Sequence, residues 1–219
     1  VCNGTGSTLT LGGHTGNVVR WEYATAPFSS WTTVSNTTTN ITTSALTQTT
    51  AYRSVVQSGA CPSVNTDSFV INTISSGVWL GVADSSWNNA ANWCGGVPAS
   101  STNVTINSGT PKSPVINTNA VVNNITINSG ANLAFAGSGN SLDIRSAITN
   151  SGTFNPANGT VIFGGIVPQQ IPGNTYSGLT VNGGSLKTLA SDVTVNGTLT
   201  LNNGIIRLGS RNITIGGTG

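Results

Sequence analysis

The sequence has few charged residues, and this shortage excludes several classes of function. Lys, Arg, Asp and Glu make up 5% of the 219 residues, against roughly 25% in an ordinary soluble domain. The net charge is +2 and no two basic residues are adjacent, so no basic stripe is present to follow nucleic-acid phosphates or an anionic membrane. We therefore expect no nucleic-acid partner and no membrane insertion, and a neutral surface rich in Thr, Ser, Asn and Gly.

Long apolar runs are also missing. None approaches the roughly 20 residues of a membrane-spanning helix, and no charged-then-apolar signal segment opens the chain. The chain begins Val1-Cys2 and ends in an incomplete repeat, Gly216-Gly217-Thr218-Gly219. We expect it to be an internal segment of a longer protein.

Groups that carry catalysis or bind metals are scarce. His14 is the only His, it stands between two turn residues, and no CxxC spacing exists, which argues against zinc and against His-dependent nucleophiles. Each of the five acids is isolated; Asp143 and Asp192 are expected about two coils apart in the repeat region, whereas glycoside hydrolysis needs two carboxylates held close together. Lys187 and Arg145 offer lyase-type bases, but no Asp cluster for calcium accompanies them. We predict no catalytic, cofactor or metal site.

Three Cys and no Met fit an oxidising exterior better than the cytosol. Cys2 and Cys61 bracket the first β-rich region, and we predict a disulfide between them, worth roughly 4 kcal/mol in the chain-entropy model. Cys94 is then either buried or paired with a part of the parent protein outside this sequence.

Residues 1–73 carry short alternating segments separated by Gly and Asn turns, which predicts an immunoglobulin-like β-sandwich. Trp21 lies on a central expected strand, where it would pack between the sheets. Cys61 follows Tyr52 by nine residues rather than by two, so the predicted disulfide would lie at the end of the sandwich. The expected strands are Thr8–Leu11, Val18–Tyr23, Trp31–Val34, Tyr52–Val56 and Ser68–Ile71.

Residues 103–219 are repetitive. Asn103–Gly109 recurs as Asn124–Gly130, and looser copies follow as far as Asn212–Gly217. A short strand with Gly and Asn turns, repeated about every 20 residues, is typical of a parallel β-helix or β-solenoid. The absence of regularly spaced Leu and of a helical pattern argues against leucine-rich repeats.

The repeat also predicts how neighbouring coils stack. Residues one and three of Val-Thr-Ile point into the coil because side chains alternate along a strand. Val104 should lie above Ile125, and Ile106 above Ile127, on parallel strands in register. The Asn residues that follow the strands should hydrogen-bond the Asn of the next coil; they are Asn107, Asn128, Asn182 and Asn196.

Residues 74–102 form a Trp-rich linker or cap between the two modules. Trp79, Trp87 and Trp93 lie within it. We favour a cap that shields the open apolar end of the first coil, because solenoids need such caps. The alternative is an aromatic platform that contacts carbohydrate.

This segment resembles a known group of proteins. Trp79-x-Gly81, then Trp87, then Asn92-Trp93-Cys94-Gly95-Gly96-x-Pro98 before a Val-Thr-Ile coil is similar to large repetitive cell-surface proteins of Bacteroidota, including gliding-motility adhesins exported by type IX secretion. Arg20–Tyr23, Leu46–Arg53 and Asn150–Phe154 extend the resemblance over nearly the whole chain. It implies an extracellular or cell-surface location and a stalk or adhesive role.

We therefore predict a non-catalytic, all-β segment that extends and presents binding domains. Its expected partners are neighbouring domains of the same long chain and surface polysaccharide. Two alternatives stay open: a carbohydrate-binding module, and an accessory region of a secreted polysaccharide-degrading enzyme.

Overall fold

The computed structural model describes residues 1–216 and confirms an all-β chain that divides into two compact units, Val1–Ser75 and Ser76–Gly219. The single helical element among the described residues is the short 3-10 helix η1 (Ala90–Asn92). Gly217 to Gly219, the end of the last sequence repeat, lie outside the described residues. No helix in the described part of the chain has the length and apolar character needed to cross a bilayer.

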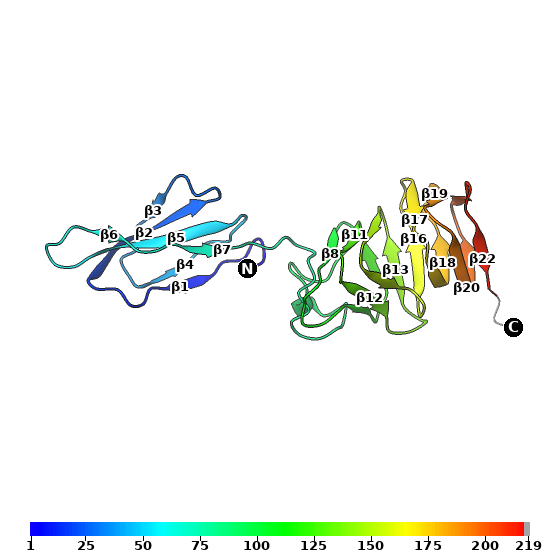
Figure 1. The fold of residues 1–219 in the computed structure, drawn as a ribbon, viewed down its shortest axis with the longest axis horizontal. Coiled ribbons are helices and arrows are strands. Elements are labelled where there is room, and N and C mark those ends of the chain that lie inside the picture. Colours follow the sequence, from blue (N-terminus) through cyan, green and yellow to red (C-terminus); the bar gives the residue numbers. More distant parts are fainter. Residues whose placement is uncertain (217–219) are drawn as a thin grey trace. The chain divides into compact units, whose positions relative to one another are not determined.

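The first unit consists of two antiparallel sheets (Figure 1). In the smaller sheet β1 pairs with β4. In the larger sheet the order is β3-β2-β5, and the other side of β5 pairs with β6 near its end and with β7 near its start. The strands are β1 (Thr8–Thr10), β2 (Asn17–Thr25), β3 (Thr32–Val34), β4 (Asn40–Thr42), β5 (Thr50–Gln57), β6 (Val64–Asn65) and β7 (Phe69–Ile71).

The core of this unit lies between the two sheets, because alternate residues of β2 and β5 face β1 and β4. Trp21 is 4% exposed and packs with Ile41, Leu46 and Val56. Its indole Nε1 donates to the Thr38 carbonyl at 2.9 Å, so the ring is buried with its polar atom satisfied. The Trp on a central strand therefore occupies the place that its sequence context predicts.

The second unit is a parallel β-solenoid of about six turns, which confirms this part of the predicted fold. Each of the first three coils gives one strand to each of three parallel sheets, and one of these sheets continues to the last coil as β10-β13-β16-β18-β20-β22. The strands are β8 (Val104–Ile106), β9 (Val115–Ile116), β10 (Ala120–Val122), β11 (Ile125–Ile127), β12 (Asn132–Phe135), β13 (Ser141–Ile144), β14 (Ile148–Asn150), β15 (Thr153–Asn155), β16 (Thr160–Phe163), β17 (Gln169–Ile171), β18 (Thr175–Val181), β19 (Leu186–Leu189), β20 (Val193–Leu201), β21 (Ile205–Arg207) and β22 (Ile213–Ile215).

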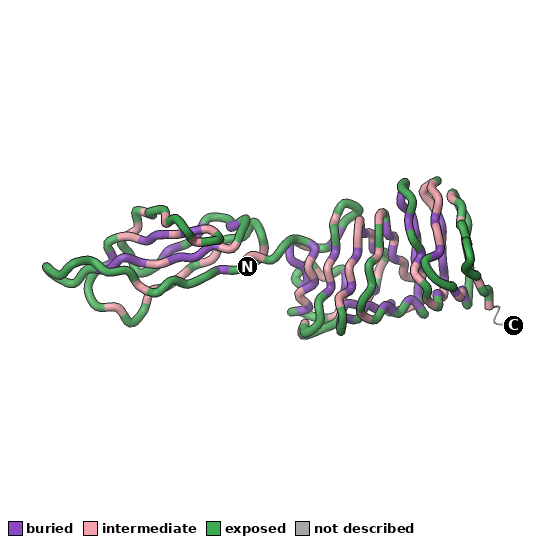
Figure 2. The backbone as a smooth tube through the Cα atoms, turned by 45° about the horizontal axis from the view of Figure 1, so that its top comes forward, coloured by how far each residue is buried: buried purple, intermediate pink, exposed green. Residues whose placement is uncertain are grey.

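The predicted register of the first coils is confirmed. β8 and β11 are parallel, with Val104 opposite Ile125 and Ile106 opposite Ile127. All four side chains are at most 1% exposed, whereas Thr126 between them is half-buried. Figure 2 shows the same alternation of buried and less buried positions along the coils. Apolar residues, both aliphatic and aromatic, thus fill the inside of the solenoid, while polar residues such as Thr126 lie on its outside.

Asn side chains link coils on the outer surface. The Asn128 amide donates to the Asn107 side-chain carbonyl at 2.7 Å, which confirms the predicted ladder at that position. A second pair, from Asn124 to Asn103, spans 2.9 Å. The ladder does not continue through Asn182, whose side-chain oxygen accepts from the neighbouring Gly183 N–H instead.

The Trp-rich segment belongs to the second unit for nearly all its length, since the chain divides after Ser75. Two of its short stretches pair in parallel with the first coil: Val78 with Thr105, and Ser86 with Val115. The segment therefore adds a partial coil in front of β8 and β9.

Candidate functional site

A cluster of interacting polar side chains in the solenoid lies where one sheet is interrupted. β17 begins the fourth coil and pairs with β19 but not with β14. The buried Gln169 amide spans the break: its Nε2 donates to the Ile144 and Ser146 carbonyls at 2.8 and 2.9 Å, and its Oε1 accepts from the Gly165 N–H at 3.0 Å. One side chain thus replaces ladder bonds that the backbone does not make.

Lys187 lies at the same break and is fully buried. Its ammonium donates to the Gly165 carbonyl at 2.7 Å, to the Ser185 hydroxyl at 2.6 Å and more weakly to the Val167 carbonyl at 3.4 Å. Burial lowers the pKa of Lys187, and the nearby Asp143 carboxylate opposes that shift. With three acceptors around its three hydrogens, the ammonium holds a loop in place.

Asp143 and Arg145 complete the cluster. Arg145 Nη2 lies 2.7 Å from Asp143 Oδ2, and about half of the Arg145 side chain is exposed. Burial raises the pKa of Asp143, while Arg145 and then Lys187 act to lower it. A side chain at Gly164 would overlap Asp143, and one at Gly165 would overlap the Arg145 carbonyl, so the close approach of the loop requires both glycines.

The loop held by this cluster, residues 164–168, carries an exposed apolar tip. Ile166 is 84% exposed and Val167 is 47% exposed. Beside the tip lies an open cavity of about 370 Å³ that Arg145 and Asn123 also line. Lys187 has no access to solvent to act as a base, and Asp143 is engaged by Arg145, so the geometry favours anchoring of the loop over proton transfer.

The other candidate catalytic or metal-binding residues from the sequence do not form a common site. Asp192 accepts from the Asn212 backbone N–H at 2.9 Å and makes no ion pair in the described part of the chain. The His14 Nδ1 is buried without a hydrogen-bond partner among residues 1–216. No group of three or more His, Cys, Asp or Glu side chains within these residues is arranged to hold a metal ion.

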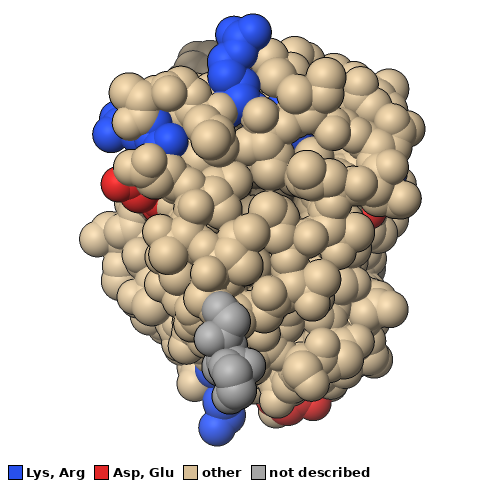
Figure 3. Space-filling view, turned by 90° about the vertical axis from the view of Figure 1, so that its right-hand side faces the viewer, with Lys and Arg blue, Asp and Glu red and all other residues tan. Residues whose placement is uncertain are grey.

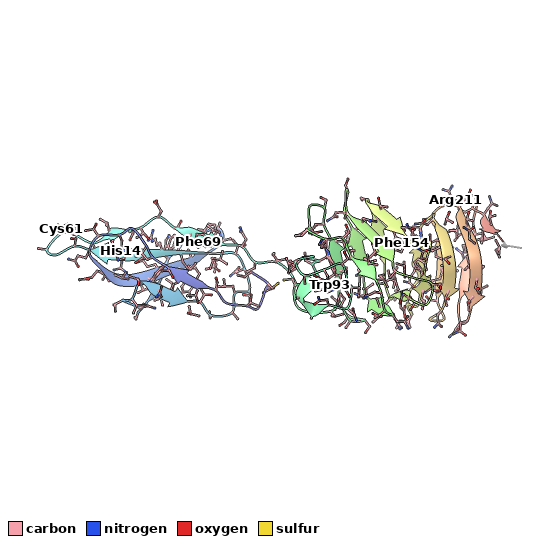
Figure 4. The ribbon with its side chains drawn as sticks, turned by 90° about the horizontal axis from the view of Figure 1, so that it is seen from below. His14, Cys61, Phe69, Trp93, Phe154 and Arg211 are labelled. Atoms are coloured by element: carbon pink, nitrogen blue, oxygen red, sulfur yellow. The ribbon has the colours of Figure 1, made fainter. Side chains whose placement is uncertain are left out.

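The predicted disulfide between Cys2 and Cys61 is wrong. Cys61 is an exposed free thiol, and Cys2 and Cys94 are the disulfide-bonded cysteines. Cys2 pairs through its backbone with Ile74, near the N-terminus (Figure 1), whereas Cys61 lies in the turn after β5 at the other end of the unit (Figure 4). The prediction assumed that two cysteines flanking the β-rich region in sequence lie close together. In the structure Cys2 and Cys61 lie at opposite ends of the first unit (Figures 1 and 4).

The three cap tryptophans are buried, at 1% for Trp79 and Trp87 and 3% for Trp93. They pack edge to face, with centroids 4.8 Å apart for Trp79 and Trp93 and 4.6 Å apart for Trp87 and Trp93. Two indoles donate to backbone carbonyls, those of Lys112 and Trp87, at 2.6 Å. No ring face is open to a sugar, so an aromatic platform at these positions is wrong.

A network behind the tryptophans was not visible as a pattern in the sequence. The fully buried Asn92 accepts from the Ala83 and Asp84 backbone N–H groups and donates to the Asp84 carboxylate and the Ser86 carbonyl. Hydrogen bonds from Asn89, Ser86 and Asn92 hold the pKa of Asp84 below its usual value. The only sequence signal was the position of Asn92 beside Trp93.

Comparison with known proteins gives two family matches. Residues 1–75 match a family described as "Domain of unknown function (DUF8696)", and residues 78–163 match one described as "Domain of unknown function (DUF8693)". No curated protein and no solved structure matches the chain. The two matches meet within a few residues of the boundary between the two compact units.

Proposed function

We propose that the chain is a non-catalytic structural and adhesive segment of a long extracellular surface protein, which extends and presents binding domains. The observation that carries this proposal is the stack of in-register coils with an apolar interior and a neutral outside. Each coil contacts only its neighbours, so the fold grows along one axis with each added repeat. That property suits a spacer better than a catalyst.

The surface chemistry supports the same role. The face seen in Figure 3 is covered almost entirely by uncharged residues, with the charged side chains near its margin. Lys187, a basic residue in the repeat region, is buried and fully hydrogen-bonded. A surface of this kind attracts neither polyanions nor polycations strongly.

We further propose that the first unit is an immunoglobulin-like sandwich and that the whole segment belongs with the repetitive surface proteins of Bacteroidota that its sequence resembles. Two antiparallel sheets packed around Trp21 support the first point. The disulfide-bonded state of Cys2 and Cys94 supports an oxidising, extracellular location.

The test is a screen of the purified chain for product release from polysaccharides and peptides, with Asp143→Asn as the matched variant. We expect no turnover from either protein. Turnover that disappears in Asp143→Asn would overturn the proposal, because it would assign catalysis to the polar cluster.

A further inference from the structure

The first unit contains a solvent-open cavity between its two sheets. Its volume is about 380 Å³, and its walls come from the ends of β2 and β5, from β4 and from the loop that joins β4 to β5. Sites for small molecules have volumes of roughly 300–1,000 Å³. The cavity is therefore large enough for a small ligand, and it lies far in sequence from the polar cluster of the solenoid.

The chemistry of the walls restricts the ligand. None of the 13 lining residues is charged, eight carry a hydroxyl group, and Gln48 adds an amide. Without Lys, Arg or a helix N-terminus the cavity offers no counter-charge to a phosphate or carboxylate. Hydroxyl groups can both donate and accept hydrogen bonds, so the walls suit a neutral ligand that itself carries many hydroxyls.

Two aromatic rings give the cavity an apolar wall. Tyr23 and Tyr52 lie opposite each other on β2 and β5, with ring centroids 5.9 Å apart. Tyr52 is 5% exposed, so it forms the floor. Tyr23 is only half-buried, which leaves part of its ring for the C–H face of a pyranose to pack against.

The polar groups at the rim are available for binding. Thr43 is already used, since its hydroxyl accepts from the Ser7 N–H at 2.9 Å and fixes the start of the loop. The exposed side chains of Ser44, Thr47 and Gln48 make no hydrogen bond within residues 1–216. A fixed floor with unengaged donors and acceptors above it is the arrangement that recognises a sugar.

We propose that this cavity binds a neutral saccharide, with the Tyr23 ring against one face of a pyranose and rim hydroxyl and amide groups bonded to its hydroxyls. This site goes beyond the proposed spacer function and does not depend on it. It also differs from the tryptophan platform considered from the sequence, because it lies in the other unit and uses the half-buried ring of Tyr23 rather than fully buried indoles.

The experiment uses the full chain and saturation-transfer NMR with calorimetry. The probes are glucose, galactose, mannose, N-acetylglucosamine and their disaccharides, with glucuronate and glucose 6-phosphate as charged counterparts. Ala45 is exposed at the cavity wall, so Ala45→Trp fills the cavity and Ala45→Ser is its control. Tyr23→Ala removes the ring, and Trp31→Ala removes an aromatic residue that instead stacks on Arg53.

We expect at least one neutral sugar to bind the wild type, Ala45→Ser and Trp31→Ala. Binding should weaken about tenfold in Tyr23→Ala and Ala45→Trp, the size expected for loss of one aromatic contact. If Tyr23→Ala does not fold, the difference in sugar affinity between Ala45→Trp and Ala45→Ser tests the proposal. The proposal is overturned if no neutral sugar binds, if Ala45→Trp binds as tightly as the wild type, or if a charged counterpart binds more tightly. None of these results bears on turnover, so the spacer proposal would stand or fall separately.

Discussion

The first coil and the last described coil of the solenoid differ in how far their apolar side chains are covered. At the first coil, Trp79, Trp87 and Trp93 cover the apolar interior and are at most 3% exposed. At the last described coil, large aliphatic side chains face solvent, with Ile205 69% and Ile215 60% exposed. A stack of coils is stable inside because every coil has two neighbours, and its ends need separate protection. Within residues 1–216 the chain supplies that protection at one end.

The largest effect should come from a charge placed between coils. Ile127 has coils on both sides and is 0% exposed, so Ile127→Asp buries an unpaired carboxylate and should cost more than about 4 kcal/mol. Thr126→Asp on the outer side should cost less than about 1 kcal/mol. Denaturant unfolding measures both, and equal tolerance would contradict the stacked-coil account.

Shortening one side chain to Ala in the cap and one in the last described coil compares how much each contributes to stability. Trp93→Ala removes the indole that contacts both other rings of the cap, and should cost about 3–5 kcal/mol. Ile215→Ala at the last coil should cost less than about 1 kcal/mol because the side chain is mostly exposed already. Thermal unfolding followed by tyrosine fluorescence and circular dichroism compares them, and a similar loss at both sites would remove the distinction.

A substitution at the interruption between β14 and β17 should lower the free energy of unfolding by an intermediate amount. Lys187→Met keeps most of the side-chain volume but removes an ammonium donor that the Gly165 and Val167 carbonyls share with the Ser185 hydroxyl, at a cost of about 1–3 kcal/mol. Lys112→Met, on the exposed surface, is the control and should change stability by less than about 0.5 kcal/mol. Calorimetric unfolding distinguishes the anchor from an ordinary surface lysine; no difference would mean that Lys187 does not anchor the loop.

Acid should weaken the capped end slightly. Hydrogen bonds hold the pKa of Asp84 below its usual value of 3.8, so its stabilisation is complete above that pH and is lost as the pH falls through the folded-state pKa. Tryptophan fluorescence between pH 5 and strongly acidic solution should report loosening of the cap that is absent in Asp84→Ala. The same acid response in the variant would assign the effect to another group.

The sequence repeat made the solenoid predictable, but it carried no information about which cysteines form the disulfide. A seven-residue match at a shift of 21 fixes which strands face each other, because a coil has to return to the same angle to stack, and β8 and β11 pair in that register. Cys2, Cys61 and Cys94 carry no such periodicity, so their partners depend on three-dimensional positions that chain order does not give.

The polar cluster and the sugar cavity were hidden for related reasons. Gln169 and Lys187 become important only because β17 fails to pair with β14, an interruption that the regular repeat obscures. Tyr23 and Tyr52 face one cavity because their strands pair in one register, and neither residue lies in a recognisable motif. Sequence patterns report regular features well and departures from regularity poorly.

Native-state hydrogen exchange, read by mass spectrometry along the coils, tests the central claim most directly. If the tryptophan cap protects the first coils of this chain, amides of β8 and β11 should be the most protected, and protection should fall steadily toward β21 and β22. Uniform protection across all six turns, or the strongest protection at β22, would contradict the account.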